Sequence, residues 1–124
     1  MAVLQDQFNY YMKTKLTKIL AKNLKRPISC LATYSPAIAK ILDGNVDIIL
    51  IGDSLGTTLY GMSNTQRVTI EMMKMHGKAV VKNIKKSLTI IDLPFKTYEN
   101  KKRAELNVKN LLNYTQADLV KIEI

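Results

Sequence analysis

One stretch of the sequence, residues 47–56, constrains the fold more than any other. It reads DIILIGDSLG, so a run of four aliphatic residues ends abruptly in a Gly-Asp-Ser turn. A continuous aliphatic run of this kind is typical of a strand buried on both faces, as in a parallel sheet. The glycines allow the backbone to turn sharply where the strand ends. We therefore expect Asp53 and Ser54 at the carboxyl end of a parallel strand, where α/β folds place their ligands. A solvated strand-to-loop turn is the alternative.

The rest of the chain alternates helical and strand-like patterns. Residues 1–26 carry apolar side chains at spacings of three and four with lysines on the other faces, which predicts an amphipathic helix packed against one end of the domain. A basic helix on a membrane surface is the alternative. Residues 28–124 read as β-α-β-α-β-α-β, with strands at 28–33, 46–51, 88–91 and 119–124, helices at 36–44, 70–80 and 100–114, and a long loop at 56–67. Successive right-handed crossovers place the strands in one parallel sheet. We expect a single α/β domain over residues 1–124.

Composition narrows the classes of function. The chain has 19 Lys and Arg against 10 Asp and Glu, a net charge of +9. A basic balance can indicate nucleic acid or an anionic membrane. Here the lysines are spread over every segment without interleaved aromatic residues, which favours small anionic substrates and neither of those partners. His76, the only histidine, is expected in a helix in a packing or surface role.

Cysteine content and hydrophobicity indicate the compartment. Cys30 is the only cysteine and lies in an apolar strand-like run, which predicts a small buried side chain in a reducing environment rather than a nucleophile. No apolar run reaches the roughly 18 residues of a membrane span. The N-terminal residues lack the apolar core of a signal peptide. We therefore expect a cytoplasmic protein.

Three acidic residues lie at the ends of three different predicted strands. Asp53, Asp92 and Glu123 would meet at one edge, because the carboxyl ends of parallel strands are neighbours in space. Three carboxylates repel each other unless they share a cation, and Mg²⁺ is the natural partner of oxygen ligands. Alternation along the last strand places Lys121 on the face of Glu123, where it can attract an anionic substrate beside the Ser54 hydroxyl. A set of acids that are merely solvated is the alternative.

The motifs DIILIGDSLG at 47–56, DLPF at 92–95 and VKIE at 120–123 together resemble ketopantoate hydroxymethyltransferases, from about residue 28 to the last residue. The resemblance implies the N-terminal half of a (β/α)8 TIM barrel and an enzyme of pantothenate and coenzyme A biosynthesis. That enzyme transfers a hydroxymethyl group from 5,10-methylenetetrahydrofolate to 3-methyl-2-oxobutanoate. The matching positions imply a Mg²⁺ site and a substrate site. The metal site would comprise Asp53, Asp92 and Glu123, and the substrate site Asp53, Ser54, Asp92 and Lys121.

The chain also departs from this family. The family's general base, a glutamate, lies on a later strand beyond Ile124, so no catalytic residue is assigned here. A glycine pair that follows the position of Glu123 in the family is replaced by Ile124 alone, and its Tyr-Asp after the first strand is Tyr34-Ser35. We therefore expect a truncated or split enzyme, weak or inactive alone. It would assemble with itself or with a partner chain that carries the missing half barrel. A non-catalytic remnant and a phosphoenolpyruvate mutase-like lyase are the alternatives.

Overall fold

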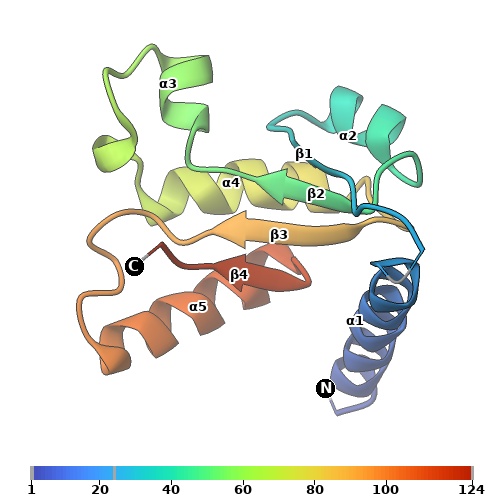
Figure 1. The fold of residues 1–124 in the computed structure, drawn as a ribbon. Coiled ribbons are helices and arrows are strands. Elements are labelled where there is room, and N and C mark those ends of the chain that lie inside the picture. The colour runs from blue at the N-terminus through green and yellow to red at the C-terminus, as the bar shows by residue number, and fades with distance from the viewer. Residues whose placement is uncertain (1, 24, 124) are drawn as a thin grey trace.

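The structure, a computed structural model, describes residues 2–23 and 25–123. Residues 1, 24 and 124, which the sequence-based predictions include, lie outside the described residues. Within the described residues one sheet holds four parallel strands in the order β1-β2-β3-β4 (Figure 1). The strands are β1 (Cys30–Ala32), β2 (Ile48–Ile51), β3 (Leu88–Asp92) and β4 (Leu119–Lys121). The helices are α1 (Ala2–Asn23), α2 (Pro36–Leu42), α3 (Leu55–Tyr60), α4 (Ile70–Val81) and α5 (Lys101–Thr115), with a short 3-10 helix η1 (Thr65–Arg67). The predicted fold class is confirmed, and the arrangement is that of the first half of a (β/α)8 barrel.

Of the helices between the strands, α2, α4 and α5 begin where the sequence supplies a capping side chain. Ser35, Thr69 and Asn100 each accept a hydrogen bond from a backbone N–H in the first turn of α2, α4 and α5. These bonds satisfy amide groups that have no partner within the helix. The predicted boundaries of α2, α4 and α5 therefore agree with the structure to within about two residues, whereas α1 ends at Asn23, three residues before its predicted end.

The hydrophobic core lies between the sheet and the helices α2, α4 and α5, which cover one of its faces (Figure 1). Ile49, Ile51 and Ile91 point into this core and are fully buried. Met73 of α4 and Leu111 of α5 pack against them. On the opposite face Ile48 and Leu50 of β2 and Ile90 of β3 are partly exposed, whereas Leu88 and Asp92 at the two ends of β3 are buried. In a complete barrel this opposite face would line the interior. Both faces of the central strands β2 and β3 would then be covered.

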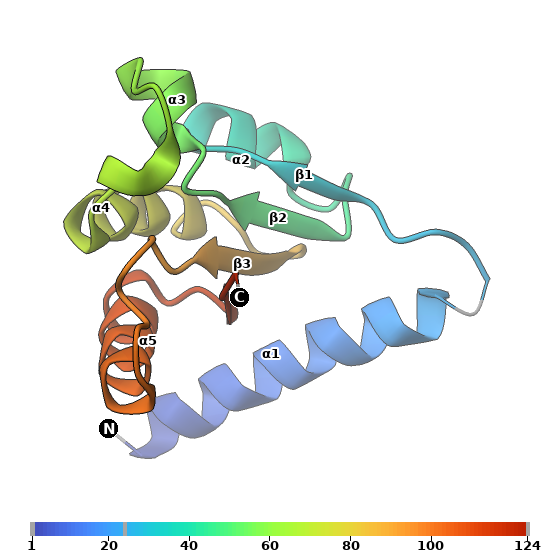
Figure 2. The same cartoon turned by 60° about the vertical axis from the view of Figure 1, so that its left-hand side comes forward.

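Ion pairs hold α1 at the amino ends of the strands. Lys15 Nζ lies 3.0 Å from Asp118 Oδ2, and Lys22 Nζ lies 2.9 Å from Asp47 Oδ1. Asp47 and Asp118 directly precede β2 and β4, so α1 crosses the end of the sheet opposite the carboxyl ends (Figure 2). The prediction that α1 packs against one end of the domain is confirmed. Its lysines do not all lie on the outer faces as predicted, because two of them bind buried aspartates.

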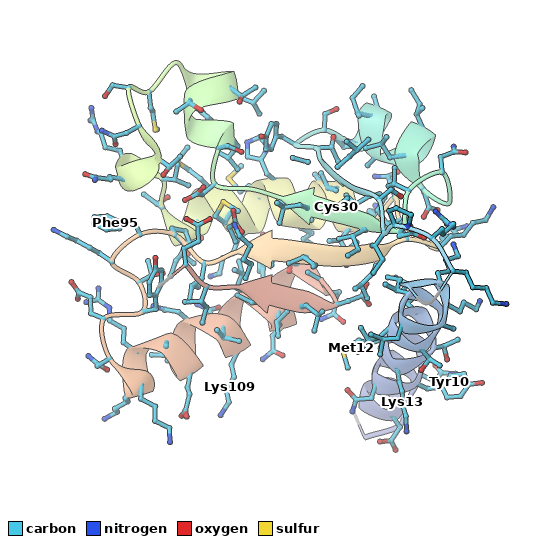
Figure 3. All side chains as sticks on the ribbon, viewed as in Figure 1. Tyr10, Met12, Lys13, Cys30, Phe95 and Lys109 are labelled. Atoms are coloured by element: carbon cyan, nitrogen blue, oxygen red, sulfur yellow. The ribbon has the colours of Figure 1, made fainter. Side chains whose placement is uncertain are left out.

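Two further predictions were wrong. Residues 56–67 contain α3 and η1 instead of one long loop. The fully buried Leu55 anchors α3, and Gly61 ends it in a left-handed conformation with φ of 63°. Cys30 is exposed rather than buried (Figure 3). The reason is that β1 is an edge strand whose three residues are all exposed.

Over residues 2–23 and 25–123, none of the helices combines the length and the hydrophobicity that crossing a membrane requires.

Candidate active site

The carboxyl ends of β2, β3 and β4 bring polar side chains to one edge of the sheet. Asp92 ends β3, and its register partner on β4 is Lys121. Lys121 Nζ lies 2.9 Å from Asp92 Oδ1 and 2.6 Å from Glu123 Oε1. The backbone N–H of Asp53, just after β2, donates a hydrogen bond of 3.1 Å to Asp92 Oδ2. The buried carboxylate of Asp92 therefore joins residues from all three strand ends.

A small pocket opens at this edge, with a volume of about 160 Å³. It is smaller than the roughly 300–1,000 Å³ of sites for drug-sized ligands, so it suits only a small molecule or a hydrated ion. Phe95, on the loop after β3, lies at its exposed rim (Figure 3). The lining residues are Asp53, Thr65, Gln66, Asp92, Leu93, Phe95, Tyr98 and Glu123.

The electrostatics of the pocket favour a cation beside Asp53. Burial and, after it, the negative charge of Asp92 raise the pKa of Asp53 above its ordinary value. A hydrogen bond with the Thr65 side chain opposes this shift without cancelling it. The ionised form of Asp53 is therefore destabilised by a neighbouring carboxylate. A bound cation would remove this repulsion.

Lys121 supplies positive charge to the same edge. Burial alone would lower the pKa of Lys121, but its hydrogen bonds to Glu123 and Asp92 and the charges of both acids outweigh burial and raise it. The side chain is therefore an ammonium at neutral pH. The hydrogen bond with Lys121 in turn lowers the pKa of the exposed Glu123.

The predicted metal ligands fit Mg²⁺ in part. In the described part of the chain, no three His, Cys, Asp or Glu side chains are grouped closely enough to hold a metal ion. Asp53 and Asp92 face one pocket with the oxygen donors that Mg²⁺ prefers. Asp92 and Glu123 are both paired with the Lys121 ammonium, so these ion pairs would have to rearrange for the two carboxylates to join Asp53 at a metal ion.

The predicted substrate residue Ser54 forms a hydrogen bond with Tyr34, a residue that the sequence pattern did not assign to the site. Its Oγ lies 2.5 Å from the hydroxyl of Tyr34, which follows β1. Gly52 leaves the space that this hydroxyl needs, since a Cβ at position 52 would lie 2.9 Å from Ser54 Oγ and 3.5 Å from Asp92 Oδ2. The position of Tyr34 directly after a strand was the available signal. The glycine of the Gly-Asp-Ser turn therefore serves the site as well as the turn.

Comparison with known proteins decides the family. A family profile described as ketopantoate hydroxymethyltransferase matches residues 13–124. The chain belongs to the ketopantoate hydroxymethyltransferase family. Relatives named 3-methyl-2-oxobutanoate hydroxymethyltransferase include one from Pelagibacter ubique, 42% identical over 112 residues that make up 90% of this chain and 44% of the relative. Another, from Anaplasma marginale strain St. Maries, is 44% identical over 112 residues, which are 90% of this chain and 40% of the relative.

A relative from Rhizobium etli is 43% identical over 107 residues, covering 86% of this chain and 39% of its own length. The chain thus spans less than half the length of these ketopantoate hydroxymethyltransferase relatives. The resemblance predicted from the three motifs is confirmed. The metal and substrate roles of individual residues stay predictions. What the structure adds is that Asp53, Asp92, Lys121 and Glu123 lie at one edge of the sheet.

Proposed function

We propose that the chain is the metal-binding and keto-acid-binding half of a 3-methyl-2-oxobutanoate hydroxymethyltransferase. Such an enzyme moves a hydroxymethyl group from 5,10-methylenetetrahydrofolate to 3-methyl-2-oxobutanoate, a step of pantothenate and coenzyme A biosynthesis. The names of the relatives support the reaction class. The observation that carries the proposal is the Asp92 carboxylate, held between the Lys121 ammonium and the Asp53 backbone N–H at the strand ends.

Mg²⁺ is the proposed cofactor, with Asp53, Asp92 and Glu123 as its ligands. When bound, it would offset the negative charge that develops on the keto oxygen as a proton leaves the neighbouring carbon. Asp53 and Asp92 hold their carboxylates toward one pocket, and the turn after β2 fixes their relative position.

The keto acid itself would be bound by Asp53, Ser54, Asp92 and Lys121. A lysine ammonium has three N–H donors, and Asp92 and Glu123 engage two of them in Lys121. The third is available to an anionic ligand. The Ser54 hydroxyl would add a neutral hydrogen bond on the side of β2. These residues bind and orient the substrate, whereas none of them is proposed to remove its proton.

The general base is proposed to be a glutamate in the part of the relatives that this chain does not match. Loss of a general base typically lowers a rate by about 10²–10⁴-fold. We therefore expect the 124-residue chain alone to bind the keto acid with little transferase activity.

Both edges of the sheet are suited to further strands. Of the described strands, β1 pairs only with β2 and β4 only with β3. Beside β4 a groove of about 540 Å³ separates α1 from α5, with Met12 and Lys109 on its two sides (Figure 3). Its apolar lining consists of Met12, Val108, Leu112, Leu119, Val120 and Ile122. We propose that the other half barrel covers these edges, from a longer chain, a partner chain or a second copy.

Titration calorimetry tests the proposed function. We expect the chain to bind 3-methyl-2-oxobutanoate in the presence of Mg²⁺ and to lose that binding when the metal is chelated. Asp92→Ala should abolish it, whereas Glu105→Ala, at an exposed site on α5, should not change it. Circular dichroism verifies that both variants fold. Binding that survives in Asp92→Ala, or no binding by the unaltered chain, would contradict the proposal.

A further inference from the structure

A chain of hydrogen bonds leads from α3 and α4 to Ser54. The Tyr34 hydroxyl lies 2.5 Å from Ser54 Oγ. His76 Nδ1, on α4, lies 3.1 Å from the backbone carbonyl oxygen of Tyr34. The hydroxyl of Tyr60, on α3, lies 2.9 Å from His76 Nε2. Among these three side chains only that of Tyr34 contacts Ser54, whereas His76 holds the backbone of Tyr34 and Tyr60 contacts His76 alone.

The chemistry of the acceptors fixes the direction of these bonds. A carbonyl oxygen only accepts, so His76 Nδ1 carries the proton that it donates to Tyr34. In the neutral imidazole, Nε2 then accepts from the Tyr60 hydroxyl. The Tyr34 carbonyl alone sets this tautomer of His76, and the ring holds the backbone of Tyr34 whether or not Nε2 has a partner.

The same reasoning applies to Ser54 and its proposed ligand. Every oxygen of a 2-oxo acid anion accepts hydrogen bonds and none donates. Ser54 can therefore bind this substrate only by donating its single hydroxyl proton. Its oxygen must then accept the hydrogen bond that joins it to Tyr34. This assignment makes the phenol of Tyr34 the donor.

We propose that Tyr34 is a positioning residue that orients the Ser54 hydroxyl toward the keto acid, and that His76 holds Tyr34 in place. The ligand in this inference rests on the proposed function. Tyr34 is half-buried and packs against the hydrophobic core, which limits the freedom of its ring. A Cβ at position 52 would lie 2.9 Å from Ser54 Oγ, so the glycine leaves the room that this orientation of the serine needs. The phenol therefore selects one direction for the serine proton.

The test compares two variants that each remove one phenolic hydroxyl. Tyr34→Phe removes the group bonded to Ser54, whereas Tyr60→Phe removes a hydroxyl that reaches only His76. By calorimetry with Mg²⁺ and 3-methyl-2-oxobutanoate, Tyr34→Phe should weaken binding about three- to tenfold, the effect of one hydrogen bond. Tyr60→Phe should bind as the unaltered chain does. In a Ser54→Ala background, Tyr34→Phe should cause no further loss. Unchanged binding in Tyr34→Phe, or a loss that adds to that of Ser54→Ala, would overturn the inference.

A measurement without ligand separates this inference from the proposed function. Proton NMR should show a slowly exchanging hydroxyl resonance in the unaltered chain and in Tyr60→Phe, and its loss in Tyr34→Phe and in Ser54→Ala. If the chain binds no keto acid while this pattern holds, the proposed function fails and the positioning contact stands. A resonance that is absent from the unaltered chain, or that persists in Tyr34→Phe, contradicts the positioning contact itself.

Discussion

Asp118 makes at the start of β4 the contacts that Asp47 makes at the start of β2. Asp47 accepts hydrogen bonds from the backbone N–H and the hydroxyl of Ser29, at 3.0 and 3.1 Å. Asp118 accepts the same pair of bonds from Thr89, both at 2.8 Å. The N–H of each aspartate returns a bond to that hydroxyl, and a lysine of α1 adds an ion pair to each carboxylate. This repeated arrangement ties neighbouring strands to each other and to α1, at the end opposite the candidate site.

Removing the charge of Asp47 should destabilise the fold. Asp47→Asn loses the ion pairs with Lys22 and Arg26 and weakens the bonds to Ser29. We expect the free energy of unfolding to fall by about 2 kcal/mol, since hydrogen bonds to charged groups are worth about 1.5–3 kcal/mol and water screens the half-exposed cations. Urea denaturation at pH 7 measures the change. Asp6→Asn, at an exposed site in α1, should change it by less than about 0.5 kcal/mol.

The same aspartate should make stability depend on pH. Hydrogen bonds from Lys22 and the Ser29 backbone hold the pKa of Asp47 well below its usual range and outweigh the effect of burial. Because the unfolded chain takes up this proton near pH 3.9 and the folded chain only at lower pH, acid favours unfolding. The stability difference between the unaltered chain and Asp47→Asn should be full at neutral pH and shrink below about pH 4. A constant difference down to pH 3 would contradict this assignment.

Local patterns explain why the sheet could be predicted. The aliphatic run before Gly52 and the caps Thr69 and Asn100 are short-range signals, and parallel connectivity follows from the alternation of elements. The inward direction of Lys15 could not be predicted, because its partner Asp118 lies 103 positions along the chain. Helix α3 was not predicted because the glycine and threonines between residues 55 and 60 favour turns, and the tertiary packing of the buried Leu55 is not visible in the local sequence.

The candidate site was predictable at the level of strand ends. Asp53 and Asp92 share an edge because parallel strands end together. The position of Lys121 between Asp92 and Glu123 depends on strand register, which the sequence pattern does not specify. Cys30 is exposed because β1 lies at the edge of the sheet. Strand order is a property of the tertiary fold, so the local sequence around Cys30 does not reveal it.

Gly77 sets how closely α4 approaches the sheet. A Cβ at this position would lie 2.4 Å from Ile91 Cδ1 and 2.9 Å from Thr115 Cγ2. Gly77→Ala should therefore lower the free energy of unfolding by about 1–3 kcal/mol, although alanine favours an isolated helix. Ile91→Val removes the clashing Cδ1 atom, so thermal denaturation of the double variant should show less than the sum of the two single losses. Strict additivity would show that the clash is relieved elsewhere.

The apolar groove beside β4 should drive association. Sedimentation at micromolar concentration in about 0.15 M salt, where surface charges are largely screened, should show dimers or larger species. Ile122→Lys places a charge in the groove and should shift the chain toward monomer. Leu106→Lys, at an exposed position on α5 outside the groove, should leave association unchanged. A monomeric unaltered chain would contradict the proposal that these edges take further strands.

Lys121 should be needed for the keto acid but not for the metal. Lys121→Gln removes the ammonium that neutralises Asp92 and Glu123. The affinity for 3-methyl-2-oxobutanoate should fall about tenfold or more, because a charge-assisted hydrogen bond is lost. Binding of Mg²⁺ alone should not weaken, since the two acids are left uncompensated. Calorimetry with each ligand separates the two effects, with the exposed Lys109→Gln as control. Equal losses for both ligands would place Lys121 in a structural role.

Paramagnetic NMR can locate the proposed metal site on the chain. Mn²⁺ takes the oxygen ligands of Mg²⁺ and broadens nearby NMR signals. Added with 3-methyl-2-oxobutanoate to the ¹⁵N-labelled chain, it should broaden the amide resonances of Asp53, Leu93 and Glu123 first, and Asp92→Ala should abolish that effect. Broadening that begins instead at the exposed acids of α4 and α5, or that persists at the strand ends in Asp92→Ala, would contradict a metal site at the carboxyl ends of the strands.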